Sequence, residues 1–199
     1  IWGGGRTSFG EADPQKVLAL MQEYKISARL TFSNSLLREE HLQDQKCNAL
    51  CALFEENKGV QNGVIIHSDL LLDYLQKKYP ELYLVSSTTK VLTNFREFLE
   101  ETDREEFCYI VPDFRFNKRF EQLNQMNAQQ KAKVEFLCNE CCWFGCKDRK
   151  VCYESVSRKN LGESCPEHDC HAPGAEGGYL FSKAMTNPGF ISVADIKDV

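Results

Sequence analysis

The sequence lacks the signatures of several common enzyme and membrane-protein classes. It has four histidines among 199 residues and contains neither a G-x-S-x-G nor an H-E-x-x-H motif. It therefore offers few candidates for a Ser-His or Cys-His pair or for a zinc protease site. No apolar run approaches the roughly 20 residues of a membrane span, and no signal-peptide pattern is visible. We expect a cytoplasmic protein with no membrane contact.

The chain also lacks an excess of positive charge. Lys and Arg number 24 against 29 Asp and Glu, which gives a formal net charge of -5 at pH 7. Non-specific binding to nucleic acid needs clustered Lys and Arg, so a nucleic-acid partner is not expected. The hydrophobic fraction is 42% and the charged fraction 27%. This composition is typical of a globular chain that can bury a core without disulfides.

Cysteine, in contrast, is abundant and concentrated. Seven of the ten cysteines fall between Cys138 and Cys170, in the stretches CNECCWFGCKDRKVC and ESCPEHDC. Thiolates gather at this density when they ligate zinc or iron, or when disulfides stabilise a small secreted domain. Because nothing in the composition indicates secretion or a need for disulfides, the cluster favours a metal site.

The first two thirds of the chain alternate short β-rich runs with segments of helical periodicity. This alternation is the signature of an α/β fold with a largely parallel sheet. We predict at least five mostly parallel strands in sequential order, connected by right-handed helical crossovers. They are expected at 26–32, 63–66, 82–85, 107–111 and 133–137.

Polar residues follow every predicted strand. In a parallel α/β barrel the C-terminal strand ends lie on one face, where such enzymes build their sites. Helix capping is the alternative explanation at any single position, but the set as a whole predicts a shared pocket. The residues are Asn34, Asp69, the run 86–89, Asp113, Asn117, Asn139 and Glu140.

Two groups of thiols come after the fifth predicted strand. Cys142 and Cys146 follow it directly, so they would lie at the same face as the polar strand exits. Cys165 and Cys170 belong to a second ligand-rich segment, CPEHDCH, which also carries two histidines. Because the intervening chain could fold back, we expect both groups to contribute to one centre.

Zinc and iron–sulfur sites would use these thiols differently. A zinc site could take two ligands from each group, for example Cys138 and Cys141 with Cys165 and Cys170, and the spacing alone favours zinc. An iron–sulfur cluster needs four thiolates, often with one remote in sequence, and Cys47 could supply that one.

The other upstream cysteines point to packing. Cys51 lies one helical turn after Cys47, on the face that carries Leu50 and Phe54, and a buried cysteine commonly acts as a small hydrophobe. Cys108 lies inside a predicted strand and is expected in the core. The role of Cys47 stays open between packing and metal binding.

The order of several longer motifs resembles that of a known family. The motifs are TFSNSLL, DQKCN, NGVIIHSD, DYLQKKYPELYLVSSTTK, YIVPDFRFN, VEFLCNECCWFGCKDRKVCYESVS and FISVADI. Together they resemble the collagenase-like peptidase family, number thirty-two among the peptidases of unknown catalytic type. More closely, the chain is similar to an uncharacterised branch of anaerobic bacterial proteins related to that family. The resemblance covers most of the chain.

The resemblance implies a TIM-barrel-like fold and a four-iron, four-sulfur cluster held by cysteines. It also implies a part in oxygen-independent hydroxylation of ubiquinone precursors, ribosomal RNA or transfer RNA. Lys147 and Cys152 depart from the branch pattern, which has proline and histidine there. The branch signature N-E-x-C-x3-C-P-x-R-x2-H-Y falls on Asn139, Glu140, Cys142, Cys146, Arg149 and Tyr153. The family's loop after its first strand is similar to the stretch Trp2 to Arg6.

These observations combine into one expectation for the fold. Residues 1–154 should form an α/β, TIM-barrel-like domain, partial or truncated relative to a full barrel of about 250 residues. Residues 155–199 should form an irregular, cysteine-rich extension packed on the same domain, because Gly, Pro and Ser dominate it.

For function, the leading hypothesis is an iron–sulfur barrel protein that takes part in an oxygen-independent modification reaction with an unidentified substrate and a partner protein or electron donor. The alternative is a non-catalytic interaction module stapled by zinc, and a peptidase ranks last. The expected metal ligands are Cys142 and Cys146 with two of Cys47, Cys165 and Cys170. The expected pocket residues are Asn34, Asp69, Asn139, Glu140 and Arg149.

Overall fold

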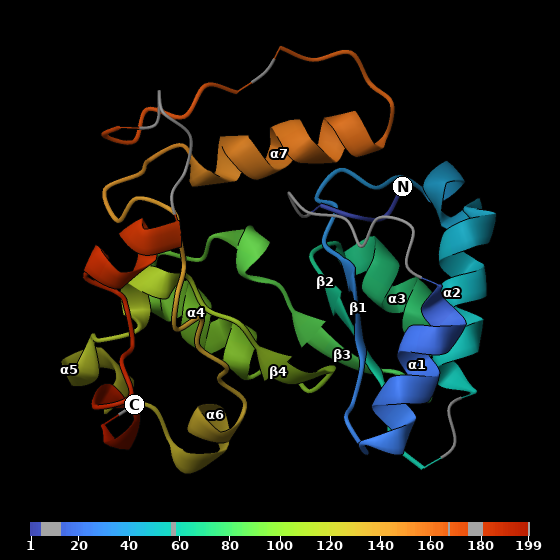
Figure 1. Cartoon of the computed structure of the whole chain (residues 1–199), viewed down its shortest axis with the longest axis horizontal. Coiled ribbons are helices and arrows are strands. Elements are labelled where there is room, and N and C mark those ends of the chain that lie inside the picture. Colours follow the sequence, from blue (N-terminus) through green and yellow to red (C-terminus); the bar gives the residue numbers. More distant parts are fainter. Residues whose placement is uncertain (5–12, 57–58, 167, 175–180, 199) are drawn as a thin grey trace. The chain divides into compact units, whose positions relative to one another are not determined.

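The computed structural model describes residues 1–4, 13–56, 59–166, 168–174 and 181–198. It has a mixed α/β architecture with a four-stranded parallel sheet in the order β1-β2-β3-β4 (Figure 1). The sequential strand order expected from the sequence is therefore confirmed. By its internal contacts the chain divides into two compact units, Ile1–Ser87 with Tyr153–Pro166 and Thr88–Cys152 with Glu167–Val199.

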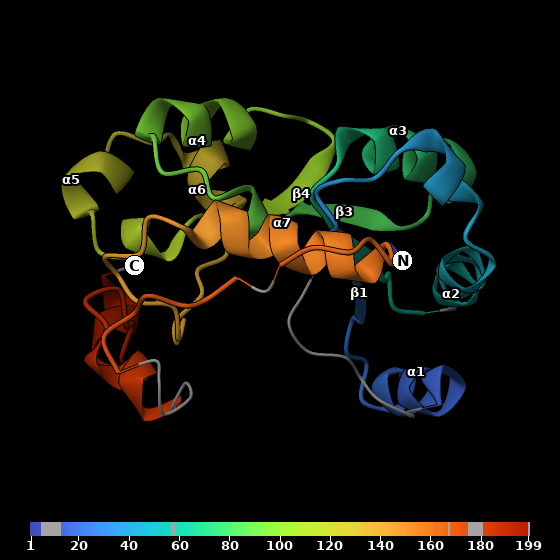
Figure 2. The ribbon, with the colours of Figure 1, turned by 90° about the horizontal axis from the view of Figure 1, so that it is seen from above.

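The first unit contains three strands in parallel register. Arg29 pairs with Gly63, and Gly63 pairs with Tyr83. Helix α1 contacts α2 (Figure 2). The elements of this unit are α1 (Pro14–Glu23), β1 (Arg29–Phe32), the 3-10 turn η1 (Glu39–Gln43), α2 (Gln45–Glu55), β2 (Gly63–Ile66), α3 (Asp69–Lys78) and β3 (Tyr83–Ser86).

Local sequence explains where the central helices of the first unit begin. The Asp44 side chain accepts a hydrogen bond from the Cys47 amide at 2.8 Å and so caps α2. Ser68 caps α3 in the same way, through the Leu71 amide at 3.4 Å. Apolar side chains at helical spacing along α3, those of Leu71, Leu72 and Leu75, are then buried. The buried core residues include Trp2, Phe32, Val64, Ile66, Leu71, Leu75, Leu84 and Val85.

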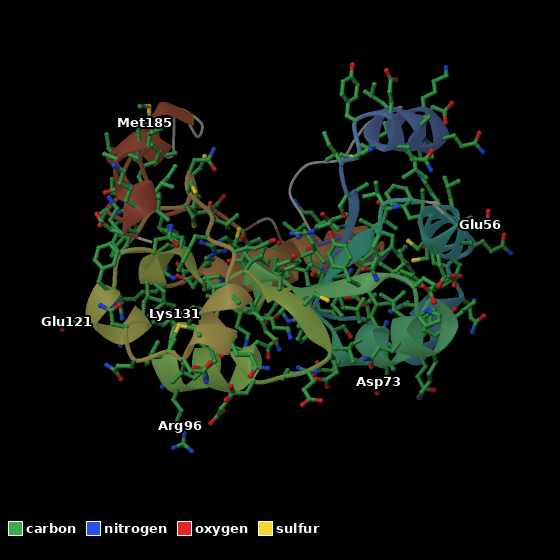
Figure 3. The ribbon with its side chains drawn as sticks, turned by 90° about the horizontal axis from the view of Figure 1, so that it is seen from below. Glu56, Asp73, Arg96, Glu121, Lys131 and Met185 are labelled. Atoms are coloured by element: carbon green, nitrogen blue, oxygen red, sulfur yellow. The ribbon has the colours of Figure 1, made fainter. Side chains whose placement is uncertain are left out.

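The second unit has an aromatic core. Phe98 stacks on Phe116 with ring centroids 5.3 Å apart, and Phe107 and Phe114 are fully buried beside these elements. Charged side chains such as Arg96 and Glu121 point away from their helices (Figure 3). The elements are η2 (Thr88–Lys90), α4 (Phe95–Thr102), β4 (Phe107–Ile110), η3 (Phe114–Phe116), α5 (Phe120–Leu123), α6 (Ala128–Ala132), η5 (Phe181–Thr186) and η6 (Asp195–Lys197).

The prediction of a fifth strand at 133–137 is wrong. Only one residue pair, Ile110 with Val134, forms a parallel bridge. Beyond it, Asn117 Nδ2 donates to the Leu137 carbonyl at 2.8 Å, and the Ile191 amide donates to the Cys138 carbonyl at 2.9 Å. Ile110 bonds to the Lys133 carbonyl and the Glu135 amide, but a side chain and a distant segment take the carbonyls that would have continued this ladder.

The segment expected to be irregular from residue 155 onward begins as a helix. Helix α7 spans Arg149–Asn160 and crosses the expected boundary at residue 154. The chain turns out of the helix at Gly162, which has a φ of +73°, and the Glu163 amide bonds back to the Arg158 carbonyl. This is the usual glycine C-terminal stop of a helix. The stretch 149–160 contains no Gly or Pro, which explains why the helix continues.

No helix in the described part of the chain is long and apolar enough to cross a membrane.

Candidate functional site

The candidate site of the second unit is built around Asp113, which follows Pro112 shortly after the end of β4. The Asp113 side chain is fully buried and accepts from the Arg115 backbone amide at 3.1 Å, which starts η3. Both of its oxygens also accept from Arg115 Nη1, at 2.9 and 3.0 Å. A buried carboxylate needs such a partner, because desolvation of an unpaired charge is strongly unfavourable. The pair therefore fixes the Arg115 guanidinium.

The remaining donors of Arg115 hold the turn that carries the predicted metal ligands. Arg115 Nε donates to the Phe144 carbonyl at 3.0 Å, and Nη2 donates to the Cys146 carbonyl. The turn itself closes through a bond of 3.0 Å from the Cys146 amide to the Trp143 carbonyl. One arginine thus fixes two carbonyl groups at the C-terminal end of the turn.

Two other side chains hold the N-terminal end of the same turn. Glu140 Oε1 accepts from the Cys142 amide at 2.9 Å. Asn187 Nδ2 donates to the Cys142 carbonyl at 2.8 Å, while its Oδ1 accepts from the Gly189 amide. A side chain at Gly189 would place its Cβ 2.6 Å from the Phe114 carbonyl oxygen. Glycine is therefore needed for the close approach of these two segments.

Arg149 connects the polar residues that follow different strands. Its side chain is 0% exposed, and its Nη2 lies 2.7 Å from Glu140 Oε2 and 3.4 Å from Thr88 Oγ1. Its Nε lies 3.8 Å from Asp113 Oδ2, and its guanidinium is 4.7 Å from the centre of the Phe114 ring. Two arginines and two carboxylates thus form one network, which we call the arginine network: Asp113, Arg115, Glu140 and Arg149.

The predicted pocket residues belong to both units, and the structure brings two of them together within the second unit. Glu140 and Arg149 are in direct contact in the second unit. Asn139 is exposed on the same segment. Asp69 is the exposed first residue of α3 in the first unit. Asn34 also belongs to the first unit.

Asn34 serves the backbone of its own unit. It is fully buried, and its Nδ2 donates to the carbonyls of Ile1 and Ser157 at 3.0 and 3.1 Å. Its Oδ1 accepts from the Leu36 amide at 2.9 Å. These three bonds use both ends of the amide to join the residues after β1 to two other segments. Asn34 therefore acts as a structural anchor.

The predicted metal ligands are distributed over both units. Cys142, Cys146 and Cys170 belong to the second unit, and Cys47 and Cys165 to the first. All ten cysteines are free thiols. Among the described residues, no group of three or more His, Cys, Asp and Glu side chains is placed to hold a metal ion. The thiols are the right kind of donor for zinc or an iron–sulfur cluster, but the described geometry does not assemble a complete ligand set.

The three cysteines outside the cluster have different environments. Cys47 and Cys51 are buried on α2, and burial raises the pKa of both thiols, that of Cys51 to about 12. The core position expected for Cys51 is confirmed. The core position expected for Cys108 is wrong, because this side chain is exposed in β4, where Phe107 and Ile110 point inward instead.

Sequence reasoning missed two residues that hold the cysteine turn. Arg115 and Asn187 act on backbone carbonyls 31 and 45 residues away, and carbonyl recognition leaves no sequence pattern. The one available signal was the spacing of Asp113 and Arg115 directly after a predicted strand. The glycine-rich stretch near the N-terminus cannot be compared, because Gly5 and Arg6 lie outside the described residues.

Comparison with known proteins supports the fold. No family model and no curated protein matches the chain. A solved structure, that of the U32 peptidase Mk0906, is similar with a TM-score of 0.54 and 14% sequence identity. The similarity covers 77% of this chain and 62% of that protein, so the chain spans less than two thirds of its length. At this level of identity the likeness is one of fold: the chain has a distant U32-like architecture.

Proposed function

We propose that this chain is a metal-binding protein in which Cys142 and Cys146 ligate one centre, with a four-iron, four-sulfur cluster as the first candidate. In this proposal the U32-like fold is a partial TIM barrel, and the protein acts in the cytoplasm of an anaerobic organism in an oxygen-independent modification reaction. The observation that carries the proposal is the fixation of the Cys142–Cys146 turn by Arg115, Glu140 and Asn187.

This fixation is more elaborate than a surface turn needs. Buried ion pairs contribute little to net stability, because desolvation offsets most of their attraction. A fold gains little from such pairs unless they also set a local geometry. Groups behind metal ligands commonly have this role, since they orient the ligands and tune the metal. Held this way, the backbone of Cys142 and Cys146 is ordered before any metal arrives.

The remaining ligands stay a prediction, with Cys170, Cys165 and Cys47 as candidates. A bound iron–sulfur cluster would supply one-electron transfer. The residues of this chain would orient and shield it: Arg115 and Asn187 hold the turn, and Glu140 keeps the Cys142 amide engaged. Arg149 in turn holds Glu140 in place.

Metal analysis of protein purified and kept without oxygen tests the proposal. We expect iron and acid-labile sulfide in the wild type. We also expect broad absorption at about 400 nm from iron–sulfur charge transfer. Cys142→Ser and Cys146→Ser should each lose the metal. Cys108→Ser is the matched control, because that thiol is exposed in β4. A wild-type protein that contains no metal under these conditions would contradict the proposal.

Zinc is the second candidate, in a non-catalytic interaction module. The observation that favours it is the contact between the His168 and His171 rings, whose centroids lie 6.3 Å apart. Cys170 lies between these two histidines in the sequence, and imidazole and thiolate together are typical zinc ligands. Colourless protein with stoichiometric zinc in the same analysis would select this candidate. Peptide hydrolysis ranks below both, because the chain lacks the protease motifs named above.

A further inference from the structure

We infer that helix α1 of the first unit is the docking surface for a second copy of this chain, with the two α1 helices packed antiparallel around a twofold axis. The surface consists of Lys16, Leu20, Glu23 and Tyr24, and we call it the α1 face. Figure 2 shows α1 at the edge of its unit. The inference does not depend on the proposed metal site.

The α1 region carries most of the exposed apolar side chains in the described part of the first unit. Leu20, Tyr24 and the nearby Ile26 are 56%, 65% and 52% exposed, and Ile1 is the other large hydrophobic residue of this unit that is exposed. Leu18 lies on nearly the opposite side of the helix from Leu20 and is buried. The helix therefore packs on its own unit through one side and leaves Leu20 and Tyr24, one turn apart, uncovered. Contiguous exposed apolar residues of this kind mark interaction sites.

The charges on the α1 face make it complementary to itself. Lys16 and Glu23 lie about two helical turns apart, one on each side of Leu20 along the helix. When a second α1 runs antiparallel across the first, Lys16 of each copy meets Glu23 of the other. A twofold contact is reciprocal, so the same attractive pair forms twice. The apolar side chains of Leu20 and Tyr24 would lie between these two pairs.

These two charges are available for such a contact. Among the described residues Glu23 has no ion-pair partner, and Lys16 has only a contact of 4.0 Å with Asp13 on its own helix. The segment from Asp13 to Ile26 carries two acidic and two basic side chains, whereas the whole chain has a formal net charge of -5. Charge repulsion between two copies is therefore weak at this segment. A partner with charge of one sign would repel either Lys16 or Glu23, but a second copy pairs with both.

The length of α1 sets the expected strength of the contact. Its ten residues make a helix about 15 Å long, so one pair of helices buries less than the roughly 1,200 Å² of a standard interface. Interfaces below that size are weak and transient. We therefore expect a reversible dimer that forms as the protein concentration rises.

Sedimentation velocity over protein concentrations from about 1 µM to about 1 mM, the range of weak interfaces, tests the inference. The protein is kept reduced and metal-free, so that its free thiols do not link copies. Lys16→Glu and Glu23→Lys each replace two attractive contacts by two repulsive ones and should weaken the dimer about tenfold. An equal mixture of the two variants restores both pairs. It should therefore dimerise like the wild type, although neither variant does so alone.

Matched variants separate this contact from general effects of charge and hydrophobicity. Lys77→Glu, at an exposed lysine of α3, changes the net charge as Lys16→Glu does and should leave the dimer unchanged. Leu20→Ser should weaken the dimer about tenfold or more, because each copy loses buried apolar surface. Val151→Ser is its control, since Val151 is 53% exposed and belongs to α7. All the substituted side chains are at the surface, so circular dichroism should show the same folded state for every variant.

The outcomes decide the inference whatever the metal analysis shows. Dimerisation that each charge variant weakens and their mixture restores supports it. A monomer at every concentration overturns it and leaves the α1 face to a partner of different sequence. A dimer that Lys16→Glu and Leu20→Ser leave unchanged overturns it as well, because the contact then lies on another surface. If both charge variants weaken the dimer but their mixture does not restore it, the antiparallel twofold arrangement is wrong.

Discussion

Each of the two units contains cysteines with the spacing C-x3-C, and the two units use this spacing in opposite ways. In the first unit, Cys47 and Cys51 lie on α2, where the helix satisfies their backbone groups and their side chains enter the core. In the second unit, Cys142 and Cys146 lie on a turn whose backbone groups are satisfied by Arg115, Glu140 and Asn187. One spacing therefore appears once in packing and once in a turn built from side chains.

The difference shows that spacing does not distinguish a ligand pair from a core pair. Residues four apart share one face of a helix, so two thiols can sit side by side in a core for reasons of packing alone. A metal ligand must also give up its proton. Burial opposes this in the first unit, where it raises the pKa of both thiols. Among the predicted ligands, Cys47 therefore has the least support.

Thiol alkylation of the metal-free, native protein sharpens this comparison most strongly. Each unit by which the pKa exceeds the pH lowers the thiolate population about tenfold, so Cys51, with a pKa near 12, should react on the order of 1,000-fold more slowly at pH 8 than an ordinary exposed thiol. The exposed Cys108 provides the reference rate, and Cys146 should react much faster than Cys51. Peptide mapping by mass spectrometry gives both rates. Equal labelling rates of Cys51 and Cys146 would show that the two cysteine pairs do not differ in this way.

The second contrast is between the charged anchors of the second unit and the neutral anchor of the first. Replacing Arg149 by Met leaves the buried Asp113 and the Glu140 carboxylate without one of their cations. Removing one partner of a buried pair costs about 3–5 kcal/mol. We expect a loss of that size in the free energy of unfolding, measured with urea. Arg96→Met, at an exposed pair with Glu100, is the control and should change stability by less than about 0.5 kcal/mol.

The neutral anchor should have a smaller effect. Asn34→Ala removes two donated bonds and leaves the Ser157 carbonyl without this partner inside the first unit. The cost of an unsatisfied buried group is about 1–3 kcal/mol, so we expect a loss in this range by the same urea measurement. Asn139→Ala, at an exposed asparagine, should be nearly neutral. A loss for Asn34→Ala as large as that for Arg149→Met would remove the distinction between the two kinds of anchor.

The sequence predicted the sheet well because the relevant signals are local. Runs of β-branched and aromatic residues placed four strands near their observed positions, such as Gly63–Ile66 and Phe107–Ile110. The fifth run pairs with β4 only around Ile110, which bonds to the Lys133 carbonyl and the Glu135 amide, because the Leu137 carbonyl and the next one, that of Cys138, bond to Asn117 and Ile191 instead. Those partners are set by the tertiary fold and have no counterpart in the residues of the run itself.

The candidate site was predictable only in part, for a related reason. Glu140, Cys142, Cys146 and Arg149 are neighbours in the sequence, so one motif contained them all. Arg115 and Asn187 reach this motif through its carbonyl groups, and any residue has a carbonyl. A pattern search finds residues whose side chains carry the chemistry. It does not find the side chains that hold another segment's backbone.

The smallest predicted effect concerns Asp195, a carboxylate of the second unit that lies outside the arginine network. A hydrogen bond from the Ser192 side chain, with others from the Ser192 amide and Lys118, lowers the pKa of Asp195 to about 2. Because the pKa in the folded state lies below the unfolded value of about 3.9, its stabilising effect is present above pH 4 and is lost as the pH falls toward 2. The Ser192 amide resonance, followed by NMR between pH 5 and pH 1.5, should titrate with a midpoint near 2. Asp195→Asn should abolish this titration. A midpoint near 4 in the wild type would show that the Ser192 bonds do not hold this carboxylate in solution.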